Sequence, residues 1–157
     1  MKKKKVVVIS LLLLLVSVIG ISSYFLFKDK INLLDVDHSA VDWNGKKQKD
    51  TSGEENTIAI PGFEKVTLYA NETNQAVNFH NPEINDCYFK ISLIHPDGSV
   101  LWISDLIEPG KGMYSIELEK TLAVGEYENA VLKYECFSLN DQSPLNGSEI
   151  NLKLVVV

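Results

Sequence analysis

The side chains best suited to chemistry in this chain are two cysteines and three histidines. Cys87 and Cys136 are far apart and do not form the Cys-x-x-Cys spacing of a redox-active site. His38, His80 and His95 are scattered, without a His-Glu-x-x-His run or a Cys/His cluster that could hold zinc. These residue types therefore predict neither a metal centre nor a redox centre, and solvated or turn-forming histidines are expected.

Other catalytic patterns are missing from the sequence. No Gly-x-Ser-x-Gly elbow presents a serine nucleophile, and no glycine-rich loop could cradle a phosphate. The acidic residues have no Asp-x-Asp-x-Asp spacing for calcium, and they are spread over predicted outer faces and turns. We therefore expect a protein without catalytic activity of its own and without a cofactor.

Charge is distributed unevenly along the 157 residues. All 15 basic residues are lysine, and only nine of them follow position 30, where 20 of the 21 acidic residues lie. Such an acidic surface repels phosphate backbones, and the lack of arginine removes the usual bidentate reader of phosphate and guanine. Nucleic acid is therefore not an expected partner.

The N-terminal region has the pattern of a membrane anchor. A basic tip at residues 1–5 precedes an apolar run over residues 6–27, which as a helix would extend about 33 Å and cross a bilayer. The lysine asymmetry places the tip in the cytoplasm and the rest of the chain outside the cell membrane. A cleaved signal peptide, giving a secreted form, is the alternative, but the run is longer than a typical signal core.

Residues 28–56 are expected to form a polar stalk between the anchor and a domain at residues 57–157. Charged residues and glycines dominate this segment, and its apolar residues have no clean period. Five of its side chains could dock either on the lipid headgroups or on the domain: Leu33, Leu34, Val36, Val41 and Trp43.

From Thr57 onward, short alternations of apolar and polar residues between turn residues predict strands. One buried face per strand indicates antiparallel sheets packed as a sandwich. The inward faces include Phe89, Ile91 and Leu93 in one strand and Leu132 and Tyr134 in another. The expected strands are Thr57–Ile60, Lys65–Tyr69, Ala76–His80, Cys87–Ile94, Val100–Ser104, Tyr114–Leu118, Tyr127–Cys136 and Glu149–Val157.

The run Leu122-Ala123-Val124-Gly125-Glu126-Tyr127 resembles the tyrosine corner of Greek-key sandwiches. Leu122, Gly125 and Tyr127 match the pattern, and Val124 replaces the usual proline. The stretch 114–134 is similar to bacterial cell-surface immunoglobulin-like modules. Residues 81–157 also resemble uncharacterised membrane-anchored proteins of low-GC Gram-positive bacteria. These resemblances imply an all-β, immunoglobulin-like Greek-key sandwich of seven or eight antiparallel strands, and they supply no activity or functional residues.

In an immunoglobulin-like order, the strands that hold Cys87 and Cys136 are antiparallel neighbours. The start of one strand then lies beside the end of the other, so a disulfide is geometrically allowed in this oxidising compartment. Two buried free thiols that pack as small apolar groups are the alternative. The sequence leaves both open.

Two polar loops flank the cysteines and are the candidate binding loops. One contains His80, Asn81, Glu83 and Asp86, and the other contains Asn140, Asp141 and Asn146. An anchored sandwich with such loops predicts an interaction or adhesion module whose partner is another envelope protein or a cell-wall component. An extracytoplasmic inhibitor, or a domain that binds a small ligand or cation, is the alternative function.

Overall fold

A computed structural model describes residues 33–45 and 57–157. The compact unit that they form begins at Leu34 and ends at Val157. Within these two ranges, no helix is long and apolar enough to cross a membrane. The apolar run over residues 6–27, where a spanning helix is expected, lies outside the described residues.

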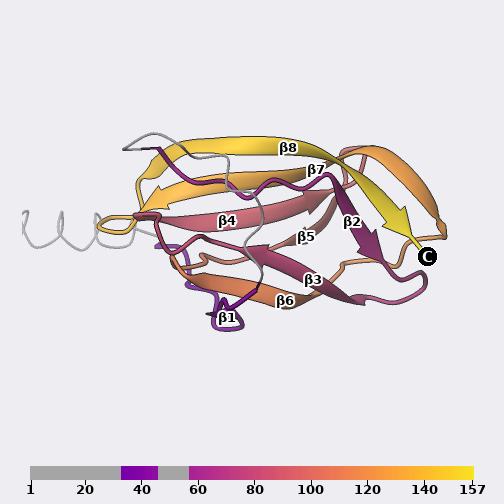
Figure 1. The fold of residues 1–157 in the computed structure, drawn as a ribbon, viewed down its shortest axis with the longest axis horizontal. Coiled ribbons are helices and arrows are strands. Elements are labelled where there is room, and N and C mark those ends of the chain that lie inside the picture. Colours follow the sequence, from indigo (N-terminus) through magenta and orange to yellow (C-terminus); the bar gives the residue numbers. More distant parts are fainter. Residues whose placement is uncertain (1–32, 46–56) are drawn as a thin grey trace, which may run out of the picture. The chain divides into compact units, whose positions relative to one another are not determined.

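The described chain is all-β and forms two sheets (Figure 1). One sheet has three strands in the order β1-β6-β3, and the other has five in the order β2-β8-β7-β4-β5. The strands are β1 (Val41–Asp42), β2 (Lys65–Leu68), β3 (Asn74–His80), β4 (Cys87–Ile94), β5 (Val100–Ile103), β6 (Lys111–Glu117), β7 (Gly125–Ser138) and β8 (Pro144–Val156).

The inner faces of both sheets share one apolar core. Phe79 from β3 packs against Trp102 from β5, with 5.8 Å between the ring centroids. The side chains predicted to face inward on β4 and β7 are almost fully buried, among them Phe89, Ile91 and Leu132. The alternation of apolar and polar residues with a period of two therefore identified the core face of the long strands, as expected for sheets with one face exposed to solvent.

The prediction that all strands pair antiparallel is wrong at one edge. Strand β2 runs parallel to β8, with Lys65 opposite Lys153 and Leu68 opposite Val156. The chain leaves β2 and crosses to the other sheet, where it forms β3, so β2 does not return as a hairpin beside its neighbour in sequence. The stretch Thr57–Ile60, expected as a strand, is not one in the structure.

The domain boundary expected at residue 57 is too late, because residues 34–45 belong to the folded unit. Strand β1 pairs antiparallel with β6, and Val36 forms a parallel bridge with Leu106. The main chain of Leu34 exchanges two hydrogen bonds with the Gln142 side chain, at 2.6 and 3.0 Å. Docking on the domain, one of the two alternatives left open for the apolar residues of this segment, is thus the arrangement found for residues 34–45.

Strands β7 and β8 form a hairpin that extends beyond the predicted strand ends. The expected loop around residues 140–147 is shorter, because β8 already begins at Pro144. The pairing shifts register between Tyr134 and Cys136, opposite Gly147. A Cβ atom on Gly147 would collide with the carbonyl oxygen of Tyr134. Glycine at this position therefore allows β7 and β8 to keep pairing past the register shift.

Tyr127, in the run that resembles a tyrosine corner, hydrogen-bonds back to the chain just before its strand. The Tyr127 hydroxyl donates to the carbonyl oxygen of Ala123 at 2.9 Å, across the turn that leads into β7. Leu122 is buried beside this turn in the core. The Tyr127 ring also makes an edge contact with His95, with 5.0 Å between centroids. These contacts fix the entry of the chain into the longest strand of the structure.

Candidate binding groove

The pairing of strands brings several loops to one end of the two sheets. His80, the last residue of β3, lies opposite Gly112 near the start of β6. Cys87, the first residue of β4, lies opposite Ser138, the last residue of β7. The segments 81–86, 108–110 and 139–143 therefore gather at this end, which includes both predicted binding loops.

Asn81 holds this end together and is not available to a ligand. It is fully buried, and its side-chain amide donates to the carbonyl oxygens of Cys87 and Ile107 at 2.8 and 3.0 Å. Its own side-chain oxygen accepts from Asn85, which also hydrogen-bonds to both main-chain groups of Ala59. This buried amide network is fully used by the fold, so it fixes the shape of the loop.

His80 is also buried, beneath Trp43. The two rings stack at 3.8 Å between centroids with planes 9° apart. The indole N–H of Trp43 donates to Oδ1 of Asn78 at 2.7 Å, and the Trp43 main-chain N–H donates to the carbonyl of Gly110 at 2.8 Å. Trp43 is therefore locked in place as a half-buried aromatic surface over an imidazole.

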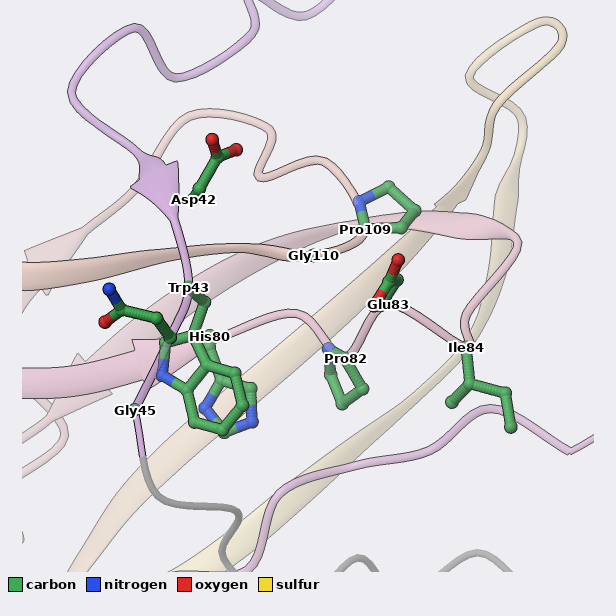
Figure 2. Close-up of a pocket in the computed structure, with 10 residues that line it drawn as sticks. Asp42, Trp43, Gly45, His80, Pro82, Glu83, Ile84, Pro109 and Gly110 are labelled. Carbon is green, nitrogen blue, oxygen red and sulfur yellow. The ribbon is translucent and has the colours of Figure 1, made fainter.

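An open groove of about 800 Å³ begins at this aromatic pair. Figure 2 shows Trp43 over His80 at one end, Ile84 at the other, and Pro82 between them. The groove thus joins three parts of the chain, and its volume lies in the range typical of ligand sites. It is lined by Asp42, Trp43, Asn44, Gly45, His80, Pro82, Glu83, Ile84, Pro109 and Gly110.

Among the described residues, the two charged side chains that line the groove, Asp42 and Glu83, are both acidic. Asp42 forms an ion pair with Lys111 at 2.5 Å, and this hydrogen bond and charge lower the pKa of the Asp42 carboxyl. Glu83 is exposed and packs its Cβ and Cγ close to Gly110. The groove therefore combines an aromatic surface, proline and isoleucine walls, and a carboxylate rim.

The second predicted loop does not join this groove. Asn140 and Asp141 are exposed at the tip of the β7–β8 hairpin, and Asn146 lies within β8. Asp141 accepts a hydrogen bond from the main-chain N–H of Ser143 at 3.1 Å, and this contact lowers its pKa. Asp86 is exposed in the first loop but does not line the groove. Of the predicted loop residues, only His80 and Glu83 meet in the groove.

The two cysteines lie side by side in the core. The structure holds both as free thiols that are 1% exposed. Because Cys87 pairs with Ser138 and Cys136 with Phe89, the two are diagonal neighbours. The Cα atoms of such neighbours lie about 7–8 Å apart, beyond the usual span of a disulfide. The hydrogen bond between the thiols, together with burial, raises the pKa of Cys136.

A histidine, an aspartate and a serine come together in the turn at residues 95–99. Asp97 Oδ1 lies 2.9 Å from His95 Nδ1 and accepts the main-chain N–H of Ser99 at 2.8 Å. Hydrogen bonds from Ser99 and then His95 lower the pKa of Asp97. The Ser99 hydroxyl also accepts a hydrogen bond from the Lys120 ammonium group at 3.1 Å. With the aspartate between serine and histidine, this cluster has the geometry of a stabilised turn and not of a nucleophile beside its base.

No group of three or more His, Cys, Asp or Glu side chains within residues 33–45 and 57–157 could hold a metal ion.

Sequence reasoning missed Trp43 as part of a site, because the residue was assigned to the stalk. The available signal was a large aromatic residue, suited to docking on the domain, in a segment dominated by polar residues. The sequence gives no indication that Pro82, Ile84 and Pro109 belong to a site, since they line the groove only when three distant segments of the chain meet. No protein-family model, curated protein or solved structure matches the chain.

Proposed function

We propose that this protein is a membrane-anchored, extracytoplasmic interaction module that binds its partner at the groove beside Trp43. The observation that carries the proposal is the groove itself, with a rigid aromatic surface and a carboxylate rim at the loop end of the domain. Rigid aromatic side chains in concave surfaces are typical anchors of binding sites. The described residues hold no nucleophile–base pair beside the groove, so binding accounts for the arrangement better than catalysis.

The fold that we propose is an immunoglobulin-like sandwich. The contiguous order β8-β7-β4 corresponds to the G-F-C sheet of that family, and β3 and β6 are neighbours like strands B and E. The tyrosine corner at Tyr127 supports the same assignment. One feature departs from the family pattern: β1, which precedes all other strands in the sequence, occupies the position beside β6 where strand D is usual.

The anchor that we propose is the apolar segment at residues 6–27, with the domain outside the cell membrane. The partner that we propose is another envelope protein or a cell-wall component.

Photo-cross-linking on intact cells tests this proposal. A benzophenone amino acid would replace Ile84, which is 79% exposed in the groove, and in a matched control Val124, which is 71% exposed before β7. Because β7 starts at Gly125 and ends beside the groove loops, Val124 reports on the opposite end of the domain. We expect one envelope protein or wall fragment to be captured from position 84 and not from position 124. Equal capture at both positions, or none at good yield, would contradict the proposed site.

A further inference from the structure

We propose that the groove binds a basic, extended peptide segment, with a lysine side chain laid over Trp43 and its ammonium group facing Glu83. This inference rests on the proposed interaction function and names the chemistry of the partner. Three independent features of the groove carry it: a fixed aromatic face, an acidic rim to which the described residues add no free cation, and an apolar wall between them.

The aromatic face is held ready for a ligand. Trp43 is fixed by its stack on His80 and by its hydrogen bond to Asn78. Gly112 lies beneath the pair, and a Cβ atom there would approach Trp43 Cδ1 to 2.8 Å. A tryptophan that cannot rotate loses little entropy when a ligand stacks on it. Among aromatic rings, the indole is also the best acceptor for a cation–π contact.

The charges at the groove select for a cation. Asp42 and Glu83 line it, and among the residues that the structure describes no lysine does. Lys111 reaches the rim but is already paired with Asp42, and this hydrogen bond and charge raise the pKa of Lys111. Glu83 has no ion-pair partner within the described residues, and it is the carboxylate that a ligand cation can meet. The excess of acidic residues after position 30 also steers cations to this surface.

The apolar wall distinguishes a lysine side chain from a simple cation. Pro82 and Ile84 extend from the aromatic pair along the groove, and Pro109 lies across from them (Figure 2). Such a surface contacts the methylene stem of lysine while the ammonium group stays at the wet rim. A metal ion would gain nothing from these walls, and an anion would be repelled by the rim. Several lysines on an extended backbone would use the full length of the groove.

Tryptophan fluorescence of the full chain in detergent micelles can measure this binding directly. The chain has two tryptophans, and Trp102 is buried in the core, so a ligand-induced change reports on Trp43. The probe is the blocked tetrapeptide of lysine, and the matched control is the blocked tetrapeptide of acetyllysine, which keeps the stem and loses the charge. The variants are Glu83→Gln in the groove and Glu119→Gln, an exposed acid beyond the far end of β6.

The proposal expects saturable quenching by the lysine peptide and none by the acetyllysine peptide at the same concentrations. Glu83→Gln should raise the apparent Kd of the lysine peptide by up to about fivefold, which is the loss expected for an exposed ion pair. Glu119→Gln should leave this Kd unchanged. Raising the salt concentration from about 50 mM to about 500 mM should also weaken binding of the lysine peptide, because salt screens the attraction between exposed charges.

Two results would overturn the inference. If both peptides quench equally, or if both glutamate variants behave alike, the groove does not recognise the cation. If an oligosaccharide of N-acetylglucosamine quenches Trp43 and the lysine peptide does not, the aromatic face is a sugar platform. Either result leaves the cross-linking test at position 84 intact, so failure of the ligand class can be separated from failure of the proposed function.

Discussion

Replacing Gly112 by alanine should disturb the packing at the groove and leave the rest of the domain folded. Gly112 is a buried residue of β6 whose φ lies outside the left-handed region, so alanine causes no backbone strain there. Its new Cβ would, however, lie 2.8 Å from Trp43 Cδ1 and 2.9 Å from His80 Cβ and from the Phe79 carbonyl oxygen. Carbon atoms in contact normally stay about 3.5–4.0 Å apart. Either Trp43 or the β3–β6 ladder must therefore move.

The expected cost follows from overpacking. Extra methyl groups in a tight site destabilise proteins by about 1–3 kcal/mol. Loss of glycine from the unfolded chain offsets about 0.4–1 kcal/mol of this. We therefore expect Gly112→Ala to lower the free energy of unfolding by about 1–2 kcal/mol, which corresponds to a fall in Tm of roughly 4–8 °C for a domain of this size.

Thermal unfolding and tryptophan emission of the full chain in detergent check this prediction together. The matched control is Gly62→Ala, because a Cβ atom at Gly62 would have no neighbour within 4 Å and Gly62 has no positive φ. The control should be neutral or slightly stabilising. Gly112→Ala should also shift the emission to longer wavelength as Trp43 leaves His80, while Trp102 remains buried. Unchanged stability and emission in Gly112→Ala would refute the close packing of β1, β3 and β6 at the groove.

Three further predictions concern the core and the corner. Tyr127→Phe removes the hydrogen bond to Ala123 and should cost about 0.5–1.5 kcal/mol, measured from denaturant midpoints. Burial raises the pKa of Tyr134 above its ordinary value of 10.0, so the folded state keeps the phenol protonated when the unfolded state ionises. Its contribution to stability should be complete below pH 10 and decline as the pH rises further, and Tyr134→Phe should flatten that decline in pH-dependent unfolding. Cys87 and Cys136 should resist maleimide in the folded protein and react after unfolding without reductant; labelling that requires a reductant would show a disulfide instead.

Local pattern was sufficient for the long strands. The alternation in β4 and β7 identified the buried face because successive side chains of a strand point to opposite sides, whatever the strand pairs with. The expected bounds of β4, Cys87–Ile94, are those of the structure. The hydrogen bond of Tyr127 to Ala123 is likewise local, since it joins residues only four positions apart. By contrast, the start of β8 at Pro144 was missed, because it depends on a register shift that glycine allows at position 147.

The sequence by itself determined an acidic, all-β domain, its buried faces and its lack of recognisable catalytic motifs, because composition and period-two alternation are properties of neighbouring residues. Only the tertiary structure decided that residues 34–45 are part of the domain, that β2 runs parallel to β8, and that Trp43 lies on His80. Each of these depends on contacts between residues distant in sequence, and a two-residue strand such as β1 has too few side chains to carry a pattern. The groove exists because three such segments meet, so no single stretch of the chain could reveal it.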